Sequence, residues 1–479
     1  MIDSTIREEF KKQVADAVRE GLYLVIPNQK KTHQYYNWPR LSYFKNGIPN
    51  LSENILSSGP LDYKSLFLDN EPIIPKNDIP SFQKLLSLVY SNSDLLNKIL
   101  PGMNPYIEEN DIARSINHHL ILRIPVQIID RYIHINDTME FNYEKFELIY
   151  EPLANSIFLE NLIVDICVPI LFLKFDFENI KISENVSIER MDDSFHFARS
   201  SLLSYSREIP PAVLSAATHC LVFRNKTIPN TNYLNLVSFI SEIESYPLED
   251  INKFFASLRL VTGVNSGYSQ LLFRPINWAI HYRGNLMPLE GTSIKAYPVL
   301  YENYYWLKDN IQELNLLNTK EIGKIFTKLM EIKESEIHIA ANRLNLCYLR
   351  ESEEDNILDA IIGLETLISD DNLSEMTYKL SIRLGALSMI SKPEGKNPFQ
   401  VFKEIKKIYS YRSAIVHGSS DKNKKKKEKS FSDNPELSIS SNAVEYLRMA
   451  LIVLIENPKY RKSEKIDEFL LSYKPELTD

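Results

Sequence analysis

Runs of β-branched and aromatic residues recur through the first two thirds of the chain, and each is short enough for one or two strands. They occupy residues 119–129, 132–135, 146–150, 170–177, 186–190, 217–223 and 268–273, with an earlier run at 21–26. Turn-forming Asn, Asp and Pro residues separate several of them, and helical spacing is found at residues 5–20 and 233–260. The pattern predicts an α+β region over residues 1–315, mainly an antiparallel sheet plus helices, with room for two subdomains split near residue 110.

The apolar pattern changes to helical spacing from Thr319 onward. Residues 320–350 carry apolar side chains at intervals of three and four, which predicts one long helix. Further helices are expected at residues 355–369, 374–390, 399–416 and 440–455. Helices joined by short links are typical of a bundle, so we expect residues 316–479 to form an all-α domain.

Length and composition are those of a globular protein with more than one core. The chain has 479 residues, of which 44% are hydrophobic and 25% charged, and only three cysteines, which suits a reducing cytoplasm. The N-terminus has no basic-then-apolar pattern, so no signal peptide is expected. No membrane span is expected either, because the most apolar stretch, residues 162–173, is short and contains Asp165 and Pro169. No Cys/His cluster has metal-ligand spacing, so no metal and no cofactor are expected.

The acidic excess lies outside the predicted helical domain. The chain has a formal net charge of -8, yet residues 321–479 carry 25 Lys and Arg against 26 Asp and Glu. A protein that coats nucleic acid nonspecifically would be basic, so that class is not favoured. One dense basic run includes Lys424, Lys425, Lys426 and Lys427. If RNA is bound, its attraction is expected there, although such a run is also typical of a solvated loop.

The end of the helix predicted at residues 399–416 combines a guanidinium with an imidazole. On a helical wheel, Arg412 falls inside an apolar stripe made of Phe402, Ile405, Tyr409 and Val416. His417 follows in the last turn, where the helix dipole favours its protonated form, and Gly418 is placed to end the helix. An arginine grips phosphate with a planar pair of donors, and a histidine transfers protons near neutral pH. The pair is a minimal set of groups for metal-free phosphodiester chemistry.

Arg412, Ser413 and His417 also match a family signature. With Ser413 as the polar residue after the arginine, the segment resembles the R-x4-H motif of the HEPN superfamily of ribonucleases. Three stretches resemble the core helices of its Apea-like branch, namely residues 358–368, 378–384 and 406–418. The resemblance covers the last third of the chain. It implies a HEPN helical bundle with Arg412 and His417 as catalytic residues and with Ser413 and Glu365 in supporting roles.

The resemblance further implies a homodimer in which two R-x4-H motifs face each other in one cleft. One arginine and one histidine are too few for both proton transfers of RNA cleavage, and two copies supply the missing groups. The implied activity is a cytoplasmic, metal-independent endoribonuclease that cuts tRNA or mRNA and leaves a 2′,3′-cyclic phosphate or 3′-phosphate and a 5′-hydroxyl. The branch is associated with anti-phage defence by abortive infection. Residues 1–315 would then sense a phage-derived trigger, restrain the nuclease or support oligomerisation.

A second stretch has the same spacing. Residues 114–119 read Arg-Ser-Ile-Asn-His-His, polar residue included. This copy precedes a strand-like run at residues 120–125 and is not embedded in a long helix followed by glycine. We therefore interpret it as a chance match.

Two alternatives to catalysis stay open. Arg412 could be a structural arginine paired with Glu365, with His417 as a helix C-cap. The protein could also be a non-catalytic module that binds RNA, nucleotides or partner proteins, with recognition carried by the N-terminal region. The aromatic residues that would serve as a stacking surface, or simply pack around an irregular loop, are Tyr35, Tyr36, Trp38 and Tyr43.

Overall fold

The computed structural model shows two compact units that are interleaved along the sequence. It describes residues 2–54, 59–68, 72–76, 79–101, 111–202, 209–308, 311–370, 375–391, 397–416 and 439–472. The N-terminal unit consists of Met1–Pro169, Asn185–Tyr246 and Ser269–Lys295, and the C-terminal unit of Ile170–Glu184, Pro247–Tyr268 and Ala296–Asp479. Residues 316–479 thus belong to one unit, while the boundary predicted near residue 315 stays a prediction.

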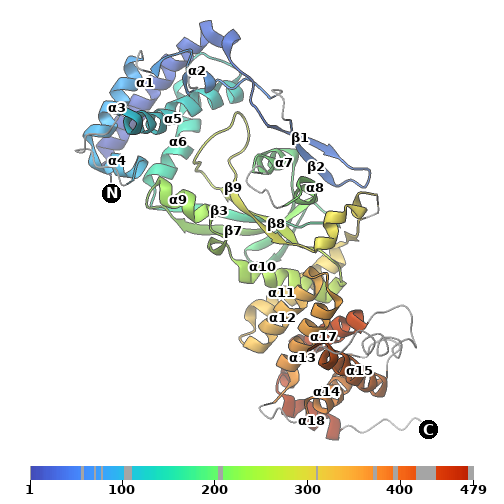
Figure 1. Cartoon of the computed structure of the whole chain (residues 1–479). Coiled ribbons are helices and arrows are strands. Elements are labelled where there is room, and N and C mark those ends of the chain that lie inside the picture. The colour runs from blue at the N-terminus through green and yellow to red at the C-terminus, as the bar shows by residue number, and fades with distance from the viewer. Residues whose placement is uncertain are drawn as a thin grey trace. The chain divides into compact units, whose positions relative to one another are not determined.

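Helices form one part of the N-terminal unit (Figure 1). They are α1 (Ser4–Asn28), α2 (Ser65–Leu68), α3 (Pro80–Ser91), α4 (Ser93–Ile99), α5 (Asp111–Asn136) and α6 (Tyr143–Phe158). Their apolar side chains meet in one core, in which Phe10, Phe82, Ile129 and Phe146 are fully buried. Burial of this kind is the main favourable term in folding, so these helices are held by a core rather than by local propensity.

Three runs predicted as strands lie in helices, and those predictions are wrong. Residues 119–129 and 132–135 belong to α5, and residues 146–150 belong to α6. Helix α5 is apolar around most of its circumference, since Ile121, Leu122, Val126, Ile128 and Ile129 are all buried. A helix without a polar face loses the 3.6-residue period that identifies helices in a sequence.

The strand predicted at residues 21–26 is also wrong, because α1 continues through it to Asn28. Gly21, at the start of this run, is buried against α5. A Cβ added at Gly21 would collide with Cδ1 of Ile129. The glycine is therefore a point of close helix packing, not a turn.

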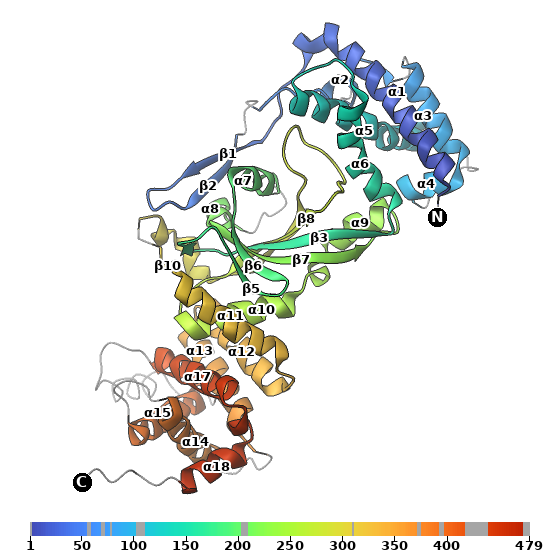
Figure 2. The ribbon, with the colours of Figure 1, turned by 180° about the vertical axis from the view of Figure 1, so that it is seen from behind.

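A sheet forms the other part of the N-terminal unit (Figure 2). Five strands lie in the order β6 (Val186–Arg190), β7 (His219–Pro229), β3 (Asn161–Pro169), β8 (Tyr268–Pro275) and β9 (Glu290–Ala296). The pairs β6–β7, β7–β3 and β3–β8 are antiparallel, with a register shift between Val164 and Ile166. The strands predicted at residues 186–190, 217–223 and 268–273 are confirmed.

The rest of the N-terminal unit comprises a hairpin and short helices. The hairpin pairs β1 (Trp38–Tyr43) with β2 (Pro49–Asn54) in antiparallel register. The helices are α7 (Asp193–Ser200), α8 (Pro211–Ser215), α9 (Tyr233–Ser241), and the 3-10 turns η1 (Gln29–Lys31) and η4 (Ile243–Ser245). The helical prediction for residues 233–260 is confirmed by α9 and by α10 (Leu248–Thr262) of the C-terminal unit.

The C-terminal unit is mainly a helical bundle. Besides α10 it contains α11 (Leu316–Glu331), α12 (Ser335–Leu349), α13 (Glu353–Ile368), α14 (Met376–Ser391), α15 (Pro398–Val416), α17 (Ile439–Glu456) and α18 (Ser463–Ser472). Its short elements are β4 (Lys174–Phe175), β5 (Asn179–Ser183), β10 (Glu313–Leu314), η5 (Val299–Asn303), η6 (Tyr305–Leu307) and η7 (Pro458–Tyr460). One core of buried aliphatic residues joins these helices, including Leu329, Leu364, Leu384, Ile405 and Leu451.

Two predictions need correction in the C-terminal unit. The single helix expected at residues 320–350 is two helices, because Ile332 turns to an extended backbone at the end of α11. Both helices bury aliphatic side chains in the same core, which made the pattern look continuous. The run at 170–177 is a strand only at Lys174–Phe175, where β4 pairs in parallel with β10.

The general fold class predicted from the sequence is confirmed. An α+β region with antiparallel strands precedes a helical region in the chain. A search of the described residues finds no helix with the length and apolar character needed to cross a membrane.

Candidate functional site

Helix α15 carries the arginine of the C-terminal R-x4-H motif. Its buried residues are Val401, Ile405, Ile408, Tyr411 and Ala414. The apolar stripe predicted from the sequence is therefore offset: Ile405 belongs to the buried face, whereas Val416 is exposed. Arg412 is seven residues after Ile405 and four after Ile408, so helical spacing places it on the buried side, in the last described turn.

The guanidinium of Arg412 is partly enclosed and only loosely paired. Its side chain is 27% exposed, and its Nη2 lies 3.8 Å from Oε2 of Glu365, whose side chain is 23% exposed. No acceptor among the described residues bonds its buried Nε. An arginine frequently forms two parallel bonds with a carboxylate, and a single contact of 3.8 Å leaves most of the Arg412 donors without a partner among the described residues.

Tyr409 completes this cluster. Its hydroxyl donates to Oε1 of Glu365 at 2.9 Å, and the Arg412 guanidinium lies 5.6 Å from the centre of its ring. Burial and then the bond to Glu365 raise the pKa of Tyr409, so the phenol is a donor at neutral pH. Glu365 of α13 therefore links Tyr409 and Arg412, one turn apart on α15, through its two oxygens.

The other residues predicted for this site are placed only in part. Ser413 is partly buried on α15, next to Arg412. His417 and the lysines of the basic run, Lys424, Lys425, Lys426 and Lys427, lie outside the described residues. The structure thus brings Arg412 and Glu365 together, as expected for a supporting or a structural glutamate.

Arg383 on α14 provides a contrast within the same bundle. It is buried, and its guanidinium donates to Asp467 at 2.9 and 2.8 Å, to Asp370 at 2.9 Å and to the carbonyl of Ile368 at 2.8 Å. Together with Lys379, it lowers the pKa of Asp370 to about 2. A guanidinium held in this way is structural, and its pairing is much closer than that of Arg412.

The second R-x4-H stretch, residues 114–119, lies on helix α5 and not before a strand. That reason for setting it aside is wrong. The side chain of Arg114 is not described, while His118 packs edge-on against Tyr90, with 5.7 Å between ring centres. His119 Nδ1 is 3.5 Å from Lys76 Nζ, and burial, with the charges of Lys76 and Arg123, lowers its pKa. A histidine with this environment favours the neutral form.

Of the aromatic residues considered as a stacking surface, Tyr35 and Trp38 pack against each other, whereas Tyr36 is 65% exposed. Tyr35 is buried and donates to Oδ2 of Asp130 at 2.5 Å, and its ring lies 5.0 Å from that of Trp38. Tyr43 is exposed, but its hydroxyl bonds Asp193 at 2.8 Å. Because Tyr35 is buried, its ring cannot stack on a base. Packing therefore accounts for Tyr35 and Trp38 better than a stacking surface does.

Sequence reasoning missed an aromatic ridge on α14 and α15. We use this name for Tyr378, Phe399 and Phe402. Phe399 stacks on Phe402 with 6.3 Å between ring centres, and Tyr378 meets Phe402 edge-on at 5.9 Å. Phe399 is 63% and Tyr378 50% exposed. The spacing of Phe399 and Phe402 was visible in the sequence, but only the packed bundle shows which aromatic rings stay exposed.

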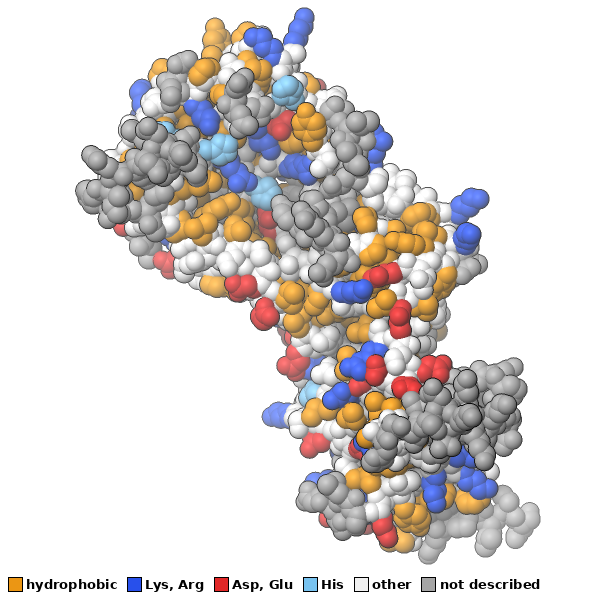
Figure 3. All heavy atoms as spheres, in the orientation of Figure 1, with side chains coloured by type: hydrophobic (Ala, Val, Ile, Leu, Met, Phe, Trp, Pro, Cys, Tyr) orange, Lys and Arg blue, Asp and Glu red, His pale blue; other side chains and the backbone are white. Residues whose placement is uncertain are grey.

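Among the described residues, no three His, Cys, Asp or Glu side chains are grouped so that they could hold a metal ion. Lys and Arg are interspersed with Asp and Glu over the described part of the C-terminal helices on the face drawn in Figure 3.

Comparisons of the chain with protein families, curated proteins and solved structures return no match.

Proposed function

We propose that the protein is a metal-independent endoribonuclease of the HEPN type that acts in anti-phage defence, with Arg412 and His417 as its catalytic residues. The observation that carries the proposal is the loose pairing of Arg412 at the end of α15, one turn before His417 in the sequence. A partly buried guanidinium with unused donors is suited to an RNA phosphate. Its contrast with the fully paired Arg383 separates it from the structural arginines of the bundle.

The chemistry divides between the two residues. His417 takes the proton from a ribose 2′-hydroxyl or returns one to the leaving 5′-oxygen, and Arg412 stabilises the charge that develops on the phosphate. Each transfer needs its own group, so two protomers provide the acid and the base in one cleft. Glu365 orients Arg412 and is a positioning residue. Ser413 lies beside it, and Lys424 to Lys427 would attract the RNA backbone.

The aromatic ridge supports the dimer. Exposed aromatic rings on adjacent helices are the kind of surface that a second copy would cover, and a two-fold axis would pair each ridge with its equivalent. Phe402 lies seven residues before Tyr409, so the ridge borders the part of α15 that leads to Arg412. An interface there would bring the two motifs toward each other.

The direct test is cleavage of RNA by the purified full-length protein in EDTA. We expect Arg412→Ala and His417→Ala each to reduce the cleavage rate by about 100-fold or more. Arg350→Ala is the matched control, because Arg350 is a partly exposed arginine paired with Asp359 at 3.2 Å in the same unit. Undiminished cleavage in either motif variant would contradict the catalytic assignment.

A lysine at position 412 separates catalysis from a structural ion pair. Arg412→Lys keeps a positive charge near Glu365 but loses the planar pair of donors. If Arg412 binds phosphate, we expect the rate to fall by about tenfold or more while the melting temperature stays near that of the wild type. If Arg412 only pairs with Glu365, the rate will be unchanged, and the catalytic role will be refuted.

A further inference from the structure

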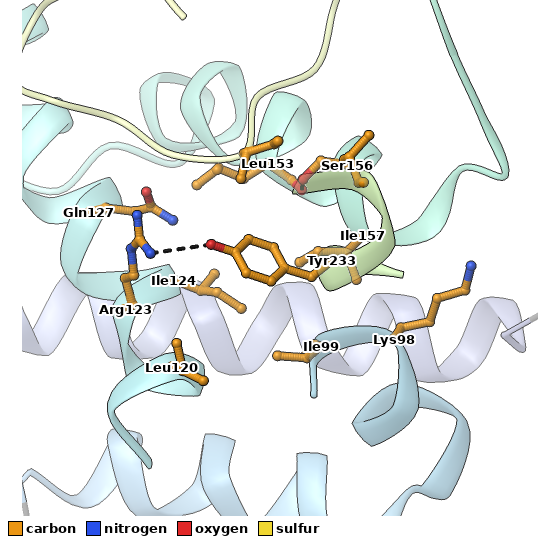
Figure 4. A pocket seen from close by; sticks show the side chains of 12 residues that line it. Lys98, Ile99, Leu120, Arg123, Ile124, Gln127, Leu153, Ser156, Ile157 and Tyr233 are labelled. Carbon is orange, nitrogen blue, oxygen red and sulfur yellow. Dashed lines mark hydrogen bonds between the residues drawn. The ribbon is translucent and has the colours of Figure 1, made fainter. Parts of the chain in front are cut away.

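A pocket lies within the N-terminal unit, between α5, α6 and α9 and beside the end of α4 (Figure 4). Its cavity volume is about 50 Å³, within about 600 Å³ of empty space that includes open solvent at its mouth. Most of its wall is aliphatic, contributed by Ile99, Leu120, Ile124, Leu153, Ile157 and Leu236. Pockets for small molecules commonly have this largely apolar lining, with a few placed polar groups that fix orientation.

The polar groups gather at one end. Arg123 of α5 points toward the hydroxyl of Tyr233, with Nη1 3.4 Å from that oxygen (Figure 4). Gln127 is one turn further along α5, and its Oε1 accepts from the backbone nitrogen of Tyr282 at 2.9 Å, which holds the amide in place. A cation, a phenol and a fixed amide thus border the same end of an apolar space.

The charge of this pocket is positive. Lys98 and Arg123 are both among the described residues that line it, and that lining contains no Asp or Glu. Lys98 donates to the carbonyl of Thr231 at 2.9 Å and lies away from the Arg123 end in Figure 4. Arg123 has no carboxylate partner within the described part of the chain. The Arg123 guanidinium lies beside an apolar cavity, and its hydrogen bond to the Tyr233 hydroxyl is weak. A guanidinium in this position favours an anionic ligand.

We propose that this pocket binds a small amphipathic anion, with its apolar chain against Ile124, Leu153 and Leu236 and its anionic head at Arg123 and Tyr233. The head is a carboxylate or a phosphate monoester, since both accept from a guanidinium and a phenol. The proposal stands apart from RNA cleavage, because none of its residues belongs to the R-x4-H site on α15.

The test is isothermal titration calorimetry of the full-length protein with decanoate, decyl phosphate and decanol, below the critical micelle concentrations. We expect both anions to bind with one-to-one stoichiometry and decanol to bind at least about tenfold more weakly than decanoate. This comparison uses the wild-type protein, so it does not depend on the folding of any variant. Equal affinities for decanoate and decanol, or no saturable binding of either anion, would overturn the proposal.

Variants locate the site. Arg123→Gln should weaken decanoate binding by about tenfold or more and leave decanol unchanged, because only the anion uses the guanidinium. Lys145→Gln is the matched control, because Lys145 is an exposed cation of the same unit that does not line the pocket, and it should change the affinity by less than about threefold. Leu236→Trp, which fills the cavity, should remove the binding of all three ligands. Wild-type decanoate affinity in folded Arg123→Gln protein would place the anion elsewhere and contradict the assignment.

Discussion

Three arginines of this chain are held in different ways, and the difference determines what each can do. Arg199 is fully buried, and its five donors reach neutral acceptors, among them Gln270 at 3.1 Å and the carbonyl of Ser215 at 2.8 Å. Arg383 is saturated by two carboxylates and a carbonyl. Arg412 has one carboxylate contact of 3.8 Å among the described residues. By this comparison, Arg412 keeps donors with which it can bind a phosphate group.

The sequence singled out the residues of this candidate site better than it predicted their geometry. Arg412, Glu365 and Ser413 could be selected from motif and spacing, and the proximity of Arg412 and Glu365 was anticipated. The offset of the buried face of α15 could not be derived, because Phe402 and Val416 are as apolar as the residues that are buried. Which apolar side chains face the core depends on α13, α14 and α17, which pack around α15.

A buried histidine gives a pH-dependent stability that can be measured. Burial, followed by the charges of Arg199 and Arg190, lowers the pKa of His196 to about 2. Below about pH 6.5 the unfolded chain binds a proton at this residue and the folded chain does not, so stability falls as the pH decreases. The contribution is about 1.4 kcal/mol per pH unit for one proton, and it is absent above pH 6.5.

We therefore expect His196→Gln to flatten the acid side of the stability curve. The glutamine oxygen can still accept from Arg199 Nε, which bonds His196 Nδ1 at 3.1 Å in the wild type. Urea unfolding at several pH values between about 6 and 4 gives the free energy of unfolding as a function of pH. The slope of this curve should be lower in the variant than in the wild type by close to one bound proton. An unchanged slope would mean that His196 is protonated in the folded protein.

At the scale of elements, helix α5 shows why the prediction failed where it did. Its residues 119–135 are rich in Ile, Leu and Val and contain Pro125, which in a sequence resembles buried strands. The helix is instead the centre of a helical core, so neither a polar face nor a helical period remains. Strands β6, β7 and β8 were found correctly, because their runs are short and bounded by turn residues.

Asp130 fixes the irregular segments around α5. This fully buried carboxylate accepts from the hydroxyl of Tyr35 at 2.5 Å and from the backbone nitrogens of Tyr63 and Gly284, each at 3.1 Å. Nε2 of His134 lies 3.4 Å from Oδ1 of Asp130. One side chain of α5 therefore holds three segments that are remote in sequence.

Removing this carboxylate should be costly. Asp130→Ala leaves the Tyr35 hydroxyl and the Tyr63 backbone nitrogen without this acceptor, so we expect the free energy of unfolding to fall by about 3 kcal/mol or more. Glu140→Ala, at an exposed carboxylate of the same unit, should change it by less than about 0.5 kcal/mol. Denaturant unfolding followed by circular dichroism measures both. If both variants lower the free energy of unfolding by the same small amount, water replaces the Asp130 carboxylate without loss of stability.

At the scale of the whole molecule, the two units are built from interleaved stretches of the chain. Local patterns alone cannot predict such a division, because segments such as Ile170–Glu184 and Pro247–Tyr268 join a unit whose main part begins only at Ala296. The change from strands to helices near residue 315 is a local feature and was visible. Which distant segments pack together is decided by tertiary contacts.

The proposed dimer makes a prediction at this scale. Phe399→Asp places a charge in the aromatic ridge, and we expect the variant to be monomeric and to lose most of its RNA cleavage. Leu317→Asp is the matched control, because Leu317 is also exposed but lies on α11. Sedimentation velocity gives the mass of each variant. A dimeric Phe399→Asp protein would place the interface elsewhere.

The most direct test of the central claim is RNA profiling with end-group mapping in cells that express the wild type or His417→Ala, with and without phage infection. We predict discrete fragments with 2′,3′-cyclic phosphate or 3′-phosphate ends and 5′-hydroxyl ends in wild-type cells, and none of these fragments in His417→Ala cells. Intact RNA in both, under infection as well, would contradict the nuclease assignment. Identical fragments in both would show that cleavage does not depend on His417.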